Sequence, residues 1–228
     1  MKIQLALILG LSFTLISCIS NKEFDQRIPY LKESERVLYA FHKTFGDTLY
    51  ESVPRIDYGK IIKGGRYIQI SHIPVNTKEQ IQKLVRIRPY SKLASFDKSL
   101  LEKLAQKTGE ASNGVDLYYK IINYWILSHY LCHKMTIPEM YDTSDTWQQE
   151  IILEKYNLYF LIKSGYSRKF QDFEKFVQLV YEETKLKVGE FKDQSEITKD
   201  GLRSGDFTHF MFFKSSSMLE AYKKAAKE

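Results

Sequence analysis

Two histidines, His129 and His133, stand four residues apart in the chain. Residues at i and i+4 lie on one face of an α-helix, where both imidazoles can reach one metal ion. The spacing is compatible with a Zn²⁺ site, with a third ligand such as Glu139, Asp142 or His209. A structural interpretation stays open beside it, because a histidine near a helix C-terminus also meets the negative end of the helix dipole favourably.

The pair resembles the zinc-peptidase motif His-Glu-x-x-His, with one departure. Tyr130 stands where that family has the glutamate that activates water. Peptidase chemistry is therefore not expected, and a metal-dependent envelope hydrolase using His129 and His133 is kept as the alternative function. Cys132 lies beside His133, but neighbouring residues point to different helix faces, so we expect a small buried residue and not a nucleophile.

Positive charge is concentrated in one stretch of the chain. Between residues 60 and 107 there are eleven basic residues and three acidic ones, although the whole chain carries only +6. Such a basic stretch is typical of a surface that binds an anionic partner. We expect that partner to bind at Lys83, Arg86, Arg88 and Lys92. A solvated basic face without a partner is the other interpretation.

The N-terminus has the pattern of an export signal. Lys2 is the only charge in the first 21 residues and precedes an apolar run that ends in Leu15-Ile16-Ser17-Cys18. This tetrapeptide resembles the lipobox of bacterial lipoproteins. The resemblance covers residues 1–18 and extends no further into the chain.

The lipoprotein resemblance implies a processing route and a location. Cys18 would receive diacylglycerol on its thiol and an acyl chain such as palmitate on its new N-terminus, giving a stable membrane anchor. The expected divisions are a signal peptide over 1–17, a lipidated tether over 18–26 and one domain over 27–228. Ile19 favours the outer membrane of a Gram-negative envelope, facing the periplasm or the surface. Export makes nucleic acid an unexpected partner and leaves membrane lipid, an anionic polymer or an envelope protein.

The elements that must position these residues are mostly helical. With 228 residues, 43% apolar residues and two cysteines, the chain is neither disordered nor a disulfide scaffold. We expect a mainly α, bundle-like single domain, whose central buried helix runs over 116–135 and carries His129 and His133. The other expected helices cover 31–49, 76–88, 97–107, 145–165, 167–189 and 218–226. A small β-hairpin is expected near 58–73, turning at Gly64-Gly65, while 207–213 fits either a strand or a helical turn.

These observations favour a lipid-anchored envelope lipoprotein that acts by binding, without catalysis. An immunity protein that blocks an incoming toxin is one specific form of that expectation. The lipid on Cys18 is the only cofactor expected, apart from Zn²⁺ at His129 and His133.

Overall fold

The structure is a computed structural model that describes residues 28–46, 55–57, 68–74, 81–188, 196 and 206–226. The expected signal peptide, lipidated Cys18 and tether therefore lie outside the described residues. The elements in chain order are α2 (Ile28–Phe45), β1 (Arg55–Asp57), β2 (Ile68–Pro74), β3 (Ile81–Ile87), η1 (Tyr90–Lys92), α3 (Ser95–Thr108), α4 (Gly114–Ile121), η2 (Ile122–Ile126), α5 (Leu127–Cys132), η3 (Pro138–Met140), α6 (Thr146–Lys163), η4 (Tyr166–Lys169), α7 (Phe173–Val188) and α9 (Phe207–Ala225).

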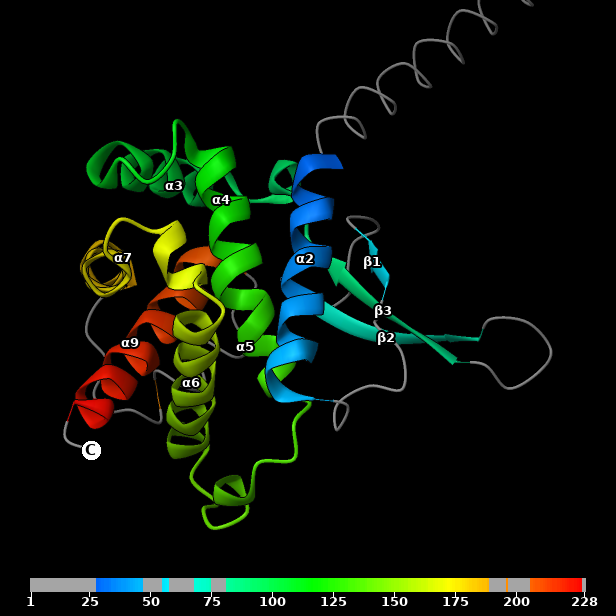
Figure 1. Cartoon of the computed structure of the whole chain (residues 1–228). Helices are drawn as coiled ribbons and strands as arrows, with labels where there is room; N and C mark the ends of the chain where they lie inside the picture. The colour runs from blue at the N-terminus through cyan, green and yellow to red at the C-terminus, as the bar shows by residue number, and fades with distance from the viewer. Residues whose placement is uncertain are drawn as a thin grey trace, which may run out of the picture.

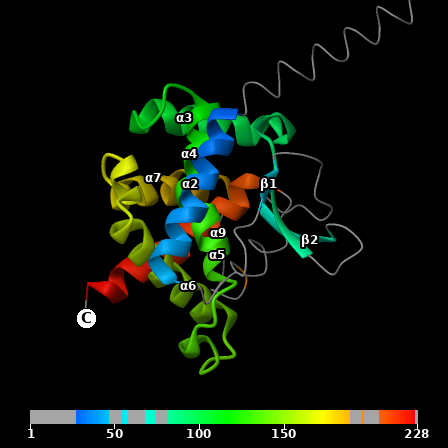
Figure 2. The same ribbon diagram turned by 45° about the vertical axis from the view of Figure 1, so that its right-hand side comes forward.

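The chain is mainly α-helical and bundle-like, as the sequence predicts. Helix α9 packs against both α6 and α7, and α5 packs between α2 and α6. Figure 1 shows α2 between the remaining helices and the small sheet. Figure 2, turned by 45°, shows the same sheet extending to one side of the helices.

The central helix is continuous but not uniform. Helix α4 begins after Asn113, whose side-chain oxygen accepts the Asp116 N–H at 3.0 Å. It passes directly into η2, a π-helical segment in which the Leu127 N–H reaches the Ile122 carbonyl five residues back, and then into α5. Trp125 lies in this segment and is fully buried, so the helix forms the centre of the core. The sequence predicts the helix but not its π segment.

Helix α9 corrects the prediction for the C-terminal region. It is one helix capped by Asp206, and not a separate element followed by a helix capped at Ser217. The Asp206 carboxylate accepts the His209 N–H at 2.8 Å, which satisfies one of the free N–H groups of the first turn. Ser217 is buried in mid-helix, where its hydroxyl donates to the Phe213 carbonyl at 3.2 Å.

The described strands form one three-stranded sheet in the order β1-β3-β2. Strand β2 coincides with part of the second arm of the predicted hairpin, but its antiparallel partner is β3, with Ile68 opposite Ile87 and Pro74 opposite Ile81. The predicted Gly64-Gly65 turn lies outside the described residues. Strand β1 pairs in parallel with β3 and lies against α2.

The helix predicted over 76–88 is wrong for residues 81–87, which form β3. The apolar residues of this segment, at 81, 84, 85 and 87, fit a helical face about as well as a strand. The branched Ile and Val residues and the pairing with β2 decide in favour of the strand. Lys83 and Arg86 thus belong to a strand, not to one helical stripe.

Among the described helices, none has both the length and the apolar character needed to cross a bilayer.

Candidate functional site

Helix α5 and its C-cap bring His129 and His133 together, as the four-residue spacing predicts. Their Nε2 atoms are 3.1 Å apart, and the rings meet edge to face. His129 is fully buried, whereas the His133 side chain is 35% exposed. His133 is therefore the member of the pair that a solute reaches from the surface.

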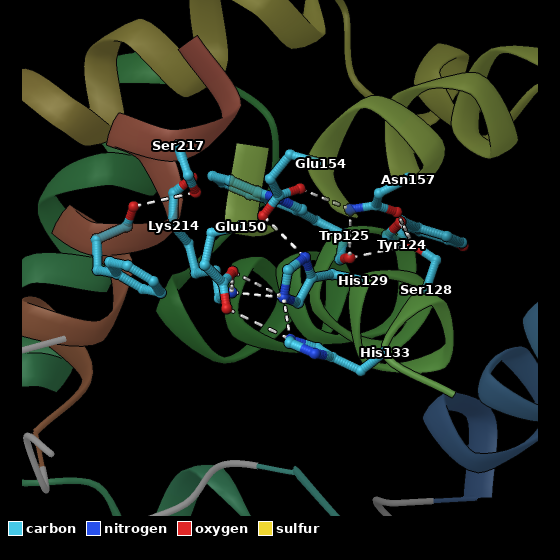
Figure 3. Close-up of polar contacts among 11 residues, drawn as sticks. Tyr124, Trp125, Ser128, His129, His133, Glu150, Glu154, Asn157, Lys214 and Ser217 are labelled. Carbon is cyan, nitrogen blue, oxygen red and sulfur yellow. Dashed lines mark hydrogen bonds and ion pairs between the residues drawn. The ribbon is translucent and has the colours of Figure 1, made fainter. Parts of the chain in front are cut away.

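The histidines face two carboxylates of α6 and one lysine of α9 (Figure 3). We call this group the buried ion cluster; it consists of His129, His133, Glu150, Glu154 and Lys214. Glu150 and Glu154 are also four residues apart, so one face of α6 presents two carboxylates to the face of α5 that carries the imidazoles. Sequence reasoning missed all three partners.

Glu150 contacts both histidines of the buried ion cluster. Its carboxylate oxygens lie 3.4 Å from His129 Nε2 and 3.5 Å from His133 Nε2. Lys214 Nζ donates to Glu150 Oε2 at 2.7 Å and also to His129 Nε2. Glu150 and Lys214 are 3% and 2% exposed, so this ion pair is almost dry.

Glu154 lies on the opposite side of the His129 ring. Its Oε1 is 3.0 Å from His129 Nδ1, although neither atom has a well-directed hydrogen bond within the described part of the chain. Its Oε2 accepts from Asn157 Nδ2 at 3.0 Å, and the same amide donates to the Trp125 carbonyl in the π segment at 3.2 Å. Because a carbonyl of the π segment binds Asn157, this irregularity of the central helix helps to position Glu154.

These contacts select one tautomer of His129. Lys214 is a donor only, so the Nε2 atom that it approaches must carry a lone pair. The ring proton then resides on Nδ1, which faces the Glu154 carboxylate. Metal-binding histidines have this arrangement, with one nitrogen free for the metal and the other turned to a carboxylate.

The electrostatics of the cluster favour ionised carboxylates. Burial alone raises the pKa of Glu150, but the Lys214 ammonium and the adjacent imidazoles outweigh it and hold that pKa well below its ordinary value. Burial opposes the same effect at Glu154, where His129 and Lys214 keep the pKa lowered. Desolvation lowers the pKa of His133, and the Glu150 carboxylate offsets only part of this shift.

The prediction of the third metal ligand is wrong: none of the three expected residues joins His129 and His133 in the described structure. Among the described residues, the metal-ligating groups that converge are His129, His133 and Glu150, whose donor atoms lie within 4.8 Å of one another. Glu139 is exposed in η3 and accepts from the Tyr156 hydroxyl at 3.1 Å. His209 pairs through Nδ1 with Asp206 at 2.7 Å, and Asp142 is exposed in the loop before α6.

Cys132, Arg88 and Lys92 are not members of the buried ion cluster. Cys132 is a free, fully buried thiol, and burial raises its pKa well above the ordinary value, which disfavours the nucleophilic thiolate. Arg88, directly after β3, is half-buried, and its carbonyl accepts from the Tyr118 hydroxyl at 2.6 Å. Lys92 is exposed in η1, while the side chains of Lys83 and Arg86 lie outside the described structure.

The donor geometry fits a tetrahedral metal ion. A metal about 2.0–2.1 Å from each of two imidazole nitrogens separates those nitrogens by about 3.3 Å, and the two Nε2 atoms are 3.1 Å apart. Two imidazoles and a carboxylate suit Zn²⁺ or a similar transition metal better than Ca²⁺ or Mg²⁺, which prefer oxygen ligands. The cluster therefore contains three groups that could hold a metal ion, His129, His133 and Glu150, and a further carboxylate, Glu154, beside the other nitrogen of His129.

Comparisons with known proteins do not assign the chain to a family: no family model, no curated protein and no solved structure matches it.

Proposed function

We propose that the protein is a lipid-anchored lipoprotein of the bacterial envelope whose helical domain acts by binding, without catalysis, and that its ligand is a divalent transition-metal ion. The anchor rests on Leu15-Ile16-Ser17-Cys18 alone. The metal is bound by His129, His133 and Glu150.

The observation that carries the metal proposal is the convergence of three donors from two helices. The donor atoms lie within 4.8 Å of one another, and Glu154 faces the nitrogen of His129 that a metal leaves free. A purely structural role for His129 explains its burial between helices. It does not explain why His133 and Glu150 converge on the same point.

The composition of the cluster suits a cationic ligand. The carboxylates of Glu150 and Glu154 face a single lysine, Lys214, which pairs with Glu150. A buried carboxylate is costly without a cationic partner, and a bound metal ion would be such a partner.

A metal-dependent hydrolase is the second candidate, favoured by the number of ligands. Three protein ligands leave the fourth position of a tetrahedral zinc ion open, which is typical of catalytic sites. The His133 side chain, which would be one of the ligands, is 35% exposed, so the site lies close to solvent. Hydrolysis of an ester or peptide probe by the zinc-loaded protein, lost in His133→Ala, would replace the non-catalytic proposal with this one.

Zinc content tests the metal proposal directly. The full-length protein is purified from membranes in mild detergent, stripped with a chelator, dialysed against Zn²⁺ and analysed for bound metal. We expect about one equivalent for the wild type and loss of tight binding in His133→Ala and Glu150→Gln, because each variant removes one ligand. Glu139→Gln, the same change at an exposed carboxylate outside the cluster, should keep the full equivalent. Wild-type protein without bound zinc would contradict the proposal.

The anchor has its own test, with a matched control among the two cysteines. Cells fed a palmitate analogue should label the wild type and Cys132→Ser, whereas Cys18→Ser should lose the label and leave the membrane fraction. Labelling that survives in Cys18→Ser would contradict a lipid anchor at that residue.

A further inference from the structure

Lys214 lies where the proposed metal would bind. Its Nζ donates to Glu150 Oε2 at 2.7 Å and to His129 Nε2, so it contacts two of the three ligand residues at once. A zinc ion about 2.0–2.2 Å from the same two side chains would overlap the ammonium group. The two cations therefore exclude each other.

We propose that Lys214 is an internal counter-ion that occupies the metal site in the metal-free protein and is displaced when the metal binds. The inference rests on the proposed metal function and adds a regulatory element to it. While the ammonium is present, the imidazole of His129 and the carboxylate of Glu150 stay in place without metal. The metal must then compete with Lys214, which sets the affinity of the site.

Burial favours exchange over simultaneous binding. Glu150 is 3% exposed and Lys214 is 2% exposed, so this side of the cluster is almost dry. Two cations side by side in such a site repel each other with little solvent to screen them, which burial disfavours.

The structure also provides a place for the displaced ammonium. Lys214 Nζ lies 4.7 Å from the ring centre of Phe213 and 6.0 Å from that of Phe210, both on the same helix α9. Aromatic faces attract cations at such distances. Phe213 is fully buried, whereas Phe210 is only partly buried. A rotation of the lysine side chain over Phe210 would move the charge toward solvent, away from His129.

Two variants and one wild-type measurement test this inference. Lys214→Met removes the competing charge but keeps a long side chain, so we expect Zn²⁺ affinity to rise about tenfold, within the 5–150-fold range of typical coupling between sites. Affinity is measured by competition with a coloured chelator on the full-length protein in detergent. Lys120→Met is the matched control, because Lys120 forms a comparable ion pair with Glu110 at 2.8 Å outside the cluster. Its Zn²⁺ affinity should stay at the wild-type value.

Thermal unfolding gives a second readout. Without metal, Lys214→Met should melt below the wild type because Glu150 is left buried without its partner, and Zn²⁺ should restore most of the loss. Lys120→Met should also melt lower, but Zn²⁺ should restore nothing beyond its effect on the wild type. Lys214→Met that melts lower and is not rescued by Zn²⁺ would overturn the exchange.

The wild-type measurement covers the case in which Lys214→Met does not fold. An amine-reactive acetylating reagent, followed by peptide mass spectrometry, should modify Lys214 faster when Zn²⁺ is bound, while modification of Lys120 stays constant. Unchanged or slower modification of Lys214 would overturn the displacement.

The outcomes separate the two proposals. Equal zinc affinity in the wild type and Lys214→Met leaves the metal function standing and overturns the role of Lys214. Absence of zinc binding in both proteins overturns the metal function and, with it, this inference.

Discussion

Helix α9 takes part in two buried polar groups of very different character. At its N-terminus, Asp97 of α3 accepts the Phe207 and Thr208 N–H groups at 3.1 and 3.0 Å and the Thr208 hydroxyl at 2.9 Å. Two turns further on, Lys214 belongs to the buried ion cluster. Both groups are buried, and both tie α9 to a neighbouring helix.

The two groups differ in how completely they are satisfied. Around Asp97, backbone donors meet both carboxylate oxygens, so the group acts as an additional helix cap. In the ion cluster, His129 Nδ1 and Glu154 Oε1 lack a well-directed hydrogen bond within the described residues, and carboxylates outnumber the ammonium. The Asp97 group needs no ligand to explain it. The ion cluster, with a partly exposed member, is the group for which we propose one.

The largest expected loss of stability comes from breaking the ion pair between Lys214 and Glu150 in the ion cluster. Lys214→Met should destabilise the metal-free protein by about 3–5 kcal/mol, because it leaves Glu150 buried without its partner. The double variant Lys214→Met/Glu150→Gln should be less destabilised than Lys214→Met, because the orphaned charge is gone. Urea unfolding without metal measures both. A double variant less stable than Lys214→Met would mean that the two charges are not coupled.

A smaller, metal-independent effect is expected at the Asp97 cap. Asp97→Ala leaves the Phe207 and Thr208 N–H groups buried without this acceptor, at a cost of about 1–3 kcal/mol for each unsatisfied group. Urea unfolding with and without Zn²⁺ measures it. The loss should be the same in both conditions, since no member of the ion cluster touches Asp97. Recovery of stability with Zn²⁺ would contradict the division between the two groups.

The pH dependence of stability distinguishes Asp97 from a third polar group, in which Glu183 pairs with Lys103 and Lys107. Desolvation raises the pKa of Asp97 despite its hydrogen bonds, so its favourable contribution is present below the unfolded value of 3.8 and is lost as the pH rises through the folded pKa. Lys103 and Lys107 hydrogen-bond Glu183 and lower its pKa; its contribution is present above the unfolded value of 4.5 and is lost as the pH falls.

The two carboxylates should therefore respond to acid in opposite directions. As the pH falls from neutral, the wild type should gain stability relative to Asp97→Asn and lose stability relative to Glu183→Gln. Urea midpoints of the three proteins across this pH range provide the measurement. Parallel changes for both variants would show that burial does not dominate at Asp97.

Local sequence patterns predict most of the helices and two of the five residues of the buried ion cluster. The histidine pair is visible because its spacing lies within one helix, and α6 is predicted with its Asp145 cap. Glu150 and Glu154 have the same four-residue spacing, which is the signal that could have found them. Nothing local says that this face of α6 meets α5, because that contact depends on how the helices pack.

The predictions that failed depend on contacts between distant segments. Residues 81–87 become a strand because β2 lies beside them, a pairing that helical spacing does not reveal. Lys214 lies in residues 214–217, for which the sequence predicts no element. They fall between 207–213, predicted as a strand or a helical turn, and the helix predicted over 218–226. The cap that extends α9 back to Phe207 comes partly from Asp97, 110 residues earlier.

The smallest expected effect concerns an exposed charge, in contrast to both buried groups. Lys92 is exposed at the end of η1, so Lys92→Gln should change stability by less than about 0.5 kcal/mol. If the basic residues bind an anionic membrane, the same variant should weaken association with phosphatidylserine-containing vesicles by about 1 kcal/mol at low salt, and less as salt screens the charge. Vesicle sedimentation of Cys18→Ser protein, with and without Lys92→Gln, removes the contribution of the anchor. Equal sedimentation of the two proteins at low salt would mean that Lys92 is a solvated charge. Of the sites proposed within the described chain, the buried ion cluster would then remain, because its case rests on converging donor atoms and not on exposed charge.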